Sequence, residues 1–331
     1  MSADLILSLK ADPILDIRII GVDASEEPSS KSLVDVFYKV PYGSDKNYGD
    51  IIFKIVKEEK VQVIVPGSDQ EAIVLSSIRN RFDELGVKLT TSPTPVLDLI
   101  KNKLVTYQKL ESSGVNLPSY RCVSDVSEIK SAFEYFNYPQ VSVVLKPIDG
   151  RGGRGLRVLE SPHDLLPAWI GNGLREKRYS HIPSDDELVE WVSEGSLMIM
   201  PALRDPAYDV DLVAKKGIAE AIIIRRRYNP VGIPFTGNTL EINPVIYEYC
   251  KKIAEILTLD GLHDIDLMTD KDGNPVVLEV NPRMSGSVPA AHKAGFPVVS
   301  LTIANMLGVS YPFNQPTVMK EILVFPACVV I

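Results

Sequence analysis

The sequence predicts an α/β protein, with a parallel, doubly wound sheet in residues 1–93 followed by an α+β part. The first observation is that short apolar strand patterns alternate with helical patterns over residues 1–93, which is typical of a parallel sheet covered by helices. The second is a boundary at Pro93 and Pro95, since prolines punctuate secondary structure. The third is a strand–turn–strand pattern over residues 264–287.

Residues 1–93 supply the strands and helices of the parallel sheet. Their patterns are, in order, a helical face at Leu5, Ile6 and Leu9, strands at 17–22 and 37–40, a helix at 48–57, a strand at 61–65, a helix at 71–85 and a strand at 87–89. Sheets of this kind bind ligands beyond the carboxyl ends of their strands. We therefore expect ligands around Asp23 and residues 66–71, where Asp69, Gln70 and Glu71 either face a cleft or cap the following helix.

The part of the chain after Pro93 begins with helical patterns and then becomes rich in strands. Its expected elements are helices at 95–113, 127–137 and 245–258, strands at 141–145, 197–200, 208–214 and 218–225, and an insert with a helical stretch at 165–170, a loop at 171–181 and a helix that starts at Ser184. Ser184 and Glu187 form the capping-box pattern of a helix start. Arg175, Lys177 and Arg178 in the insert either reach over a cleft toward an acidic substrate or belong to a solvated loop.

The predicted C-terminal hairpin brings oxygen ligands together. Asp272-Gly273 is a tight-turn signal, and Glu279 and Asn281 share one face of the second strand because they are two residues apart. Asp266 on the first strand can lie beside them, and such oxygens suit a hard divalent ion such as Mg²⁺. Arg283 could meet phosphate oxygens. A surface hairpin with solvated acids is the alternative, but an unpaired charge between the apolar neighbours of Glu279 would be costly.

A glycine-rich loop follows the strand at 141–145. Lys146 comes directly after this strand, and residues 149–155 have the sequence DGRGGRG. Glycines let backbone N–H groups turn toward an anion, and a lysine with two arginines could neutralise phosphate. The spacing matches neither a Walker A motif nor a GxGxxG motif, so a flexible turn is the alternative. Lys103, considered alone, would be a solvated lysine of the helix at 95–113.

The bulk composition excludes several classes of protein. The 331 residues are 45% hydrophobic and 24% charged, which is typical of a soluble globular protein. The net charge of -8 argues against a general nucleic-acid or anionic-membrane binder. Cys122, Cys250 and Cys328 are widely separated and fit a reduced, cytoplasmic compartment. The longest apolar stretches, about ten residues, are too short to span a membrane, and the N-terminus is not a signal peptide.

The order of these motifs resembles the ATP-grasp superfamily. The motifs are Lys103, Lys146, the loop at 150–155, Tyr208-Asp209-Val210-Asp211, Arg225–Arg227, Asp266 and the run EVNPRMSG from Glu279 to Gly286. The likeness is greatest to the ATP-binding halves of the carbamoyl phosphate synthase large subunit. It implies a pre-ATP-grasp domain at 1–93 and an ATP-grasp domain at 94–331, with a lid subdomain at about 120–200.

The resemblance implies a role for each motif. The ATP-binding residues would be Lys103, Lys146, Gly152, Gly153, Arg154, Gly155, Met200, Pro201 and Ala202; the metal ligands would be Asp266, Glu279 and Asn281; and the catalytic residues would be Arg225, Arg283 and Asn281. Strand alternation puts Arg225 and Arg227 on one face, and Arg225 is the preferred contact for the γ-phosphate. Arg283 and Ser285 would lie near an acyl phosphate. ATP with Mg²⁺ or Mn²⁺ would be required.

The chain departs from the family pattern at several points. The hinge at residues 198–202 lacks the usual glutamate or glutamine, and Ala207 stands where a ribose-binding acid is common. The usual first strand with its glycine-rich turn is missing, so we expect the first sheet to be one strand short. The duplicated half, the oligomerisation module and the allosteric module of a full synthase are also missing, so the chain is not expected to be a carbamoyl phosphate synthase by itself.

The chemistry that the resemblance implies is activation of a carboxylate by ATP to an acyl phosphate, followed by attack of an amine. The partners would be a small-molecule carboxylate and a small-molecule amine, whose identities the sequence does not disclose. Two other interpretations stay open: a phosphotransferase that stops after phosphate transfer, and a nucleotide-binding module without chemistry. The oligomeric state is also open, with a homodimer as one candidate.

Overall fold

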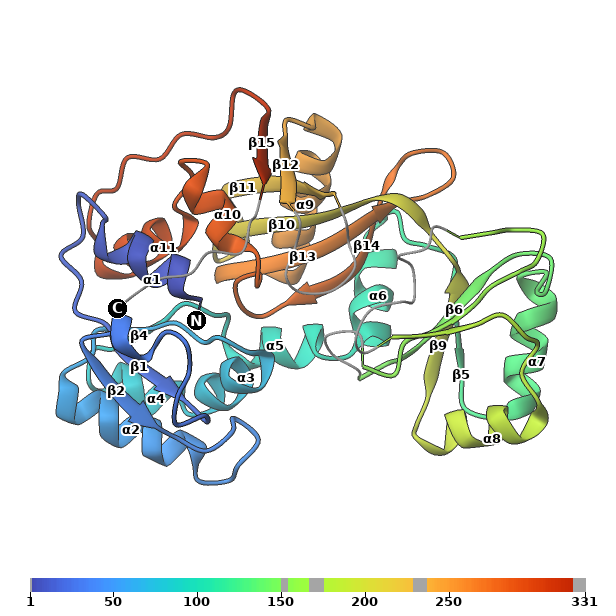
Figure 1. Cartoon of the computed structure of the whole chain (residues 1–331), viewed down its shortest axis with the longest axis horizontal. Helices are drawn as coiled ribbons and strands as arrows, with labels where there is room; N and C mark the ends of the chain where they lie inside the picture. Colours follow the sequence, from blue (N-terminus) through green and yellow to red (C-terminus); the bar gives the residue numbers. More distant parts are fainter. Residues whose placement is uncertain (1, 150–153, 167–175, 229–236, 324–331) are drawn as a thin grey trace.

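The computed structural model describes residues 2–149, 154–166, 176–228 and 237–323. Figure 1 shows the elements up to β4 at the lower left, a large sheet above them, and a second sheet with its own helices at the right. Within the described residues, no helix combines the length and the apolar character needed to cross a membrane.

The N-terminal part confirms the predicted alternation of strands and helices. Its elements are α1 (Ala3–Lys10), β1 (Ile20–Asp23), the 3-10 helix η1 (Lys31–Leu33), β2 (Val36–Lys39), α2 (Tyr48–Glu59), β3 (Val63–Ile64), α3 (Asp69–Ser77), α4 (Arg79–Asp83) and β4 (Lys88–Leu89). The described strands form two separate parallel pairs, β1–β2 and β3–β4, rather than one continuous sheet. The predicted helix at 71–85 is divided at Ile78, whose φ of -111° departs from helical geometry.

The prediction of a single helix at 95–113 was wrong. The segment forms α5 (Thr94–Ile100) and α6 (Lys103–Glu111), separated by Lys101 and Asn102. Asn102 is extended, and its side chain accepts a hydrogen bond from the N–H of Val105 at 3.1 Å, so it caps a new helix. Lys103 is consequently the first residue of α6, and its N–H donates to the carbonyl of Ile148 at 2.9 Å.

A five-stranded sheet with two helices forms the part at the right of Figure 1. Its elements are β5 (Arg121–Val123), α7 (Val126–Tyr135), β6 (Val143–Pro147), β7 (Arg157–Leu159), β8 (Lys177–Tyr179), α8 (Asp185–Ser193) and β9 (Leu197–Pro201). The capping box at Ser184 is confirmed. The predicted loop is corrected at its end, because Lys177–Tyr179 forms a strand parallel to β7. Of the predicted helix at 165–170, Leu165 and Leu166 are not helical and the remainder lies outside the described residues.

A six-stranded sheet, ordered β14-β13-β10-β11-β12-β15, forms the centre of the molecule. Its strands are β10 (Arg204–Lys215), β11 (Ile218–Arg227), β12 (Gly237–Glu241), β13 (Gly261–Thr269), β14 (Pro275–Asn281) and β15 (Lys320–Leu323), with helices α9 (Pro244–Leu257), α10 (Val288–Lys293) and α11 (Val298–Leu307). All the described strand pairs in it are antiparallel, as expected for an α+β part. The predicted hairpin is β13–β14, and Gly273 in its turn has a φ of +82°.

The two faces of the six-stranded sheet are covered by different helices. Ile253 of α9 packs with Val210 and Ile265 on one face. On the opposite face, α10 and α11 pack together with α1, whose Leu5 and Leu9 join their core. Burying one leucine side chain contributes about 1.5–3 kcal/mol to the stability of the fold. The contacts of Leu5 and Leu9 with α10 and α11 therefore anchor α1 to residues from the far end of the chain.

Candidate functional site

One face of the six-stranded sheet changes from apolar to polar along its strands. Val213 on β10 and Leu262 on β13 are buried against α10 and α11. Side chains alternate with a period of two along a strand, so Asp209, Asp211, Asp264 and Asp266 point to the same side. The register pairs Asp209 with Asp266 and Asp211 with Asp264. Carboxylates from two neighbouring strands therefore meet on the polar half of this face.

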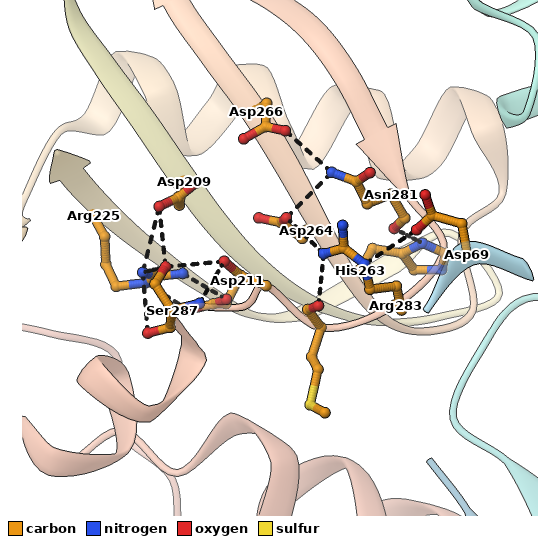
Figure 2. Close-up of polar contacts among 12 residues, drawn as sticks. Asp69, Asp209, Asp211, Arg225, His263, Asp264, Asp266, Asn281, Arg283 and Ser287 are labelled. Atoms are coloured by element: carbon orange, nitrogen blue, oxygen red, sulfur yellow. Dashed lines mark hydrogen bonds and ion pairs between the residues drawn. The ribbon is translucent and has the colours of Figure 1, made fainter. Parts of the chain in front are cut away.

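The predicted metal ligands lie together at the edge of this polar half. The register of β13 and β14 pairs Asp266 with Glu279 and Asp264 with Asn281. Asn281 Nδ2 donates to Asp264 Oδ2 and to Asp266 Oδ2, each at 3.2 Å (Figure 2). The register shifts between Asp266 and Leu267, directly beside the pair of Asp266 and Glu279. The hairpin thus supplies oxygen ligands, as a hard divalent ion requires.

Two acids of this group, Asp209 and Asp264, were not among the predicted ligands. Ligand oxygens of Asp209, Asp264 and Asp266 all lie within 4.8 Å of one another. Asp209 is 1% exposed and Asp264 is 4% exposed. The alternating sequences Asp209-Val-Asp211 and Asp264-Ile-Asp266 were the available signal, because each places two acids on one strand face.

Burial and crowding change how these acids titrate. Burial raises the pKa of Asp264 well above its usual range, and the charges of Asp266 and Asp209 act in the same direction. Burial also raises the pKa of Asp266 to about 6, although Arg227 opposes the shift. Burial acts against the charged form of Asp209, but ion pairs with Arg227 and Arg225 outweigh it and lower the pKa of that group.

Arg225 is wholly buried, which sequence analysis did not predict. Its Nε lies 2.8 Å from Asp211 Oδ2 and its Nη2 lies 2.9 Å from Asp211 Oδ1. Its Nη1 contacts Ser287 in the loop after β14 (Figure 2). Arg227 is 23% exposed at its side chain and bridges Asp209 and Asp266. The geometry therefore places Arg227, rather than Arg225, at the open side of the polar cluster.

Arg283 joins the two halves of the chain. Its Nε lies 3.1 Å from Asp69 Oδ1, at the start of α3, and its Nη1 lies 3.2 Å from Asp264 Oδ2. Nη1 also donates to the carbonyl of Met284 at 2.8 Å. Ser285 is buried and its hydroxyl contacts that of Ser287 at 3.0 Å.

Asp69 is at the predicted ligand edge of the first sheet, and its neighbour Glu71 has a different role. The Glu71 carboxylate accepts from the N–H groups of Gly67 and Ser68, so it caps α3. Asp69 instead lines a crevice beside β14, together with Ile73, Leu97, Glu279 and Asn281.

The two predicted phosphate-binding lysines lie on the same side of β14. Lys103 Nζ is 3.0 Å from Glu279 Oε1. Lys146 Nζ is 3.3 Å from the hydroxyl of Tyr107 and 3.3 Å from the carbonyl of Leu278. Burial lowers the pKa of Lys146 to about 7, with repulsion from Lys103 as the second cause and Glu279 opposing. An anion that replaced water here would meet two closely spaced cationic groups.

The remaining predicted residues border this region. Met200 is 3% exposed, and the N–H of Ala202 donates to the carbonyl of Ser142 at 2.8 Å, which continues the pairing of Pro201 in β9. Ala207 is buried and offers no side-chain oxygen. Arg154 is exposed, whereas Gly152 and Gly153 lie outside the described residues. Gly155 has a φ of +75°, and a Cβ there would lie 2.8 Å from Pro147 Cγ, so only glycine fits.

The linker between the two parts of the chain contacts the hairpin directly. Thr91 Oγ1 donates to the carbonyl of Pro282 at 2.6 Å. Ser92 Oγ lies 2.8 Å from His263 Nε2, and His263 Nδ1 lies 3.1 Å from the carbonyl of Asn281. The backbone of the predicted ligand Asn281 is therefore supported by residues of the linker.

Two family models match the chain. Residues 5–90 match the model "PylC-like, N-terminal domain", and residues 193–325 match "ATP-grasp in the biosynthetic pathway with Ter operon". Among curated proteins, the carbamoyl phosphate synthase large chain of Clostridium botulinum is 24% identical over 309 residues, covering 91% of this chain and 27% of that protein. The corresponding protein of Rubrobacter xylanophilus is 24% identical over 347 residues, covering 94% and 31%. The chain thus spans about three-tenths of the length of these relatives.

Solved structures share the fold. The biotin carboxylase domain of Hydrogenobacter thermophilus 2-oxoglutarate carboxylase, in complex with MgADP and bicarbonate, has a TM-score of 0.67 at 18% identity, covering 94% of this chain and 68% of that one. Staphylococcus aureus N5-carboxyaminoimidazole synthetase complexed with ADP has a TM-score of 0.65 at 14% identity, covering 96% and 76%. An L-amino acid ligase from Bacillus licheniformis has a TM-score of 0.62 at 16% identity, covering 92% and 72%.

Proposed function

Because this chain belongs to the ATP-grasp superfamily, we propose that it is an ATP-dependent carboxylate–amine ligase that works through an acyl phosphate. The observation that carries the proposal is the convergence of Asp266, Glu279 and Asn281 with Lys103 and Lys146 at one end of the central sheet. Oxygen ligands beside paired cationic groups are what a metal-bound polyphosphate requires. The L-amino acid ligase of similar fold supports the choice of reaction class.

In the first step, the substrate carboxylate attacks the γ-phosphorus of ATP and ADP leaves. Lys103 and Lys146 neutralise phosphate oxygens, and Arg227 faces the transferring group from β11. One pair of opposite charges about 4 Å apart contributes roughly 4 kcal/mol at an effective dielectric constant of about 20. Mg²⁺ or Mn²⁺ held by Asp266, Glu279 and Asn281 would withdraw charge from the phosphate. The side-chain oxygens of these three residues, which the register of β13 and β14 brings together, fit such an ion.

In the second step, the amine attacks the acyl carbon, phosphate leaves and the nitrogen loses a proton. Arg283 is positioned to hold oxygens of the acyl phosphate, since it already bridges the carboxylates of Asp69 and Asp264. The free thiols of Cys122 and Cys250 accord with a cytoplasmic location for this reaction.

Glu279→Gln tests the proposal. The substitution removes a metal-binding charge and the partner of Lys103, so ATP turnover should fall to background. Asp272→Asn, on the exposed turn of the same hairpin, should keep wild-type turnover. Full activity of Glu279→Gln would remove Glu279 from the mechanism.

The absence of a side-chain oxygen at Ala207 favours a second candidate, a nucleotide-binding module without chemistry. Incubation with Mg-ATP, candidate carboxylates and amines separates the candidates. A ligase releases ADP and forms an amide, a phosphotransferase releases ADP without an amide, and a binding module releases neither. A thermal-shift screen of carboxylates and amino acids with Mg-AMPPNP would identify the substrates, because ligands of the folded state raise its apparent stability.

A further inference from the structure

The polar cluster contains more negative than positive side chains. The ion pairs on and beside the sheet connect six carboxylates, those of Asp69, Asp209, Asp211, Asp264, Asp266 and Glu279, with four cationic groups, those of Lys103, Arg225, Arg227 and Arg283. Lys146 is close to Glu279 and Asp266, and a protonated Lys146 would still leave the cluster short of positive charge. A buried cluster of this composition needs bound protons or a bound cation.

The carboxylate of Asp264 is the group in the cluster that needs a compensating proton or positive charge. Its Oδ2 accepts from Asn281 and from Arg283, whereas its Oδ1 is fully buried and has no hydrogen-bond partner among the residues that the structure describes. Figure 2 shows the carboxylate of Asp264 between Asp209 and Asn281, with a contact to Arg283. An unpaired oxygen of a buried carboxylate costs several kcal/mol unless a proton or a cation occupies the space beside it.

The spacing of the carboxylates in the cluster suits a small ion. The ligand atoms of Asp209, Asp264 and Asp266 lie within 4.8 Å of one another, about twice the bond length between a divalent cation and an oxygen ligand. Asp209 and Asp264 are each less than 5% exposed, so the site excludes an ammonium group that is attached to a larger molecule. The hydroxyl of Ser287 lies 3.1 Å from Asp209 Oδ2 and adds another oxygen.

We propose that Asp209, Asp264 and Asp266 form a binding site for a hard divalent cation that fills without nucleotide and does not use Glu279. This site goes beyond the proposed ligase function, whose metal would be held by Asp266, Glu279 and Asn281. The cation at the new site fixes the Asp264 carboxylate, and through it Arg283, before nucleotide arrives.

Mn²⁺ titration of the nucleotide-free full chain tests the site, with binding followed by electron paramagnetic resonance. The wild-type chain should bind one equivalent of Mn²⁺. Asp264→Asn should weaken this binding at least tenfold, because the asparagine oxygen can keep the contacts to Asn281 and Arg283 while its amide nitrogen replaces the unpaired oxygen. Glu279→Gln should bind within about twofold of wild type, and Asp272→Asn serves as the surface control.

Thermal melting of the same variants shows whether each of them is folded. Without metal, Asp264→Asn should melt at or above the wild-type temperature, since it removes an uncompensated buried charge, and Mn²⁺ should raise the melting temperature of wild type but not of Asp264→Asn. The proposal is overturned if nucleotide-free wild type binds no Mn²⁺, if Asp264→Asn binds it like wild type, or if Glu279→Gln loses it equally. Loss of ATP turnover in Glu279→Gln with unchanged nucleotide-free Mn²⁺ binding would separate this site from the ligase metal.

Discussion

Ser92 and His263 meet through a 2.8 Å contact between Oγ and Nε2, and both residues are wholly buried. Burial lowers the pKa of His263, so the ring is neutral at physiological pH. Nδ1 lies 3.1 Å from the carbonyl of Asn281, and Nε2 lies 3.2 Å from the carbonyl of Asp260 as well as beside the Ser92 hydroxyl. The linker before α5 is in this way bonded to the strand that carries the proposed metal ligands.

Ser92→Ala should lower the free energy of unfolding by about 1–3 kcal/mol, because His263 Nε2 and the N–H of Asp260 would both lose their contact with the Ser92 hydroxyl. Urea denaturation measures the change. Ser112→Ala is the control, since the exposed Ser112 hydroxyl donates to the carbonyl of Lys109 in its own helix. Its effect should stay below about 0.5 kcal/mol, and equal effects of the two substitutions would contradict the role of Ser92.

Gly261→Ala should be more destabilising than Gly273→Ala. Both glycines have positive φ, +90° and +82°, so alanine is strained at either position. A Cβ at Gly261 would also lie 2.5 Å from the carbonyl oxygen of Thr90, whereas one at Gly273 would meet nothing within 4 Å. We expect about 1 kcal/mol for Gly273→Ala and at least twice that for Gly261→Ala. Matching unfolding curves for the two variants would argue against close docking of the linker on β13.

Arg225→Met should destabilise the fold by about 3–5 kcal/mol, because it leaves the buried Asp211 carboxylate without its partner. The neighbouring Arg226→Met is the control, since Arg226 is half exposed and lies 3.6 Å from Glu241. Exposed pairs contribute about 0–1 kcal/mol. Chemical denaturation of the two variants distinguishes a structural Arg225 from one that mainly serves the nucleotide, for which stability would change little.

Lys146 makes stability depend on pH. Its pKa is about 7 in the folded chain, against 10.5 for an ordinary lysine, so the unfolded chain binds more protons between these values. The free energy of unfolding therefore gains from Lys146 as pH rises through this window. Lys146→Met removes the free-energy cost of burying a charged amine. The stability of this variant relative to wild type should therefore be greatest near pH 6 and decline toward pH 9. Urea denaturation at several pH values checks this, and an advantage that grows with pH would contradict the burial of a charged Lys146.

The sequence predicted the elements whose signals are local. The capping box at Ser184 and the turn at Asp272-Gly273 were found because each depends on a few adjacent residues. The helix break at Asn102 was missed because the helical pattern continues across it. The capping role of Asn102 becomes evident only once Lys103 is seen bonded to Ile148.

The part of the candidate site that could be predicted consists of residues that share one strand. Glu279 and Asn281 follow from strand alternation alone. The inclusion of Asp209, and the burial of Arg225, depend on the register between strands that are distant in sequence. That register cannot be derived from the alternation of side chains along a strand or from the composition.

The packing of α1 has a consequence for how the chain can be divided. Leu5 and Leu9 complete the core formed by α10 and α11, and Leu15 joins the same core. A chain cut between residues 93 and 94 would leave one fragment with an uncovered apolar helix and the other with an unfilled groove. The two fragments should then be recovered as an aggregate or as a reassociated pair, and expression of the second fragment alone should need the first eleven residues supplied as a peptide.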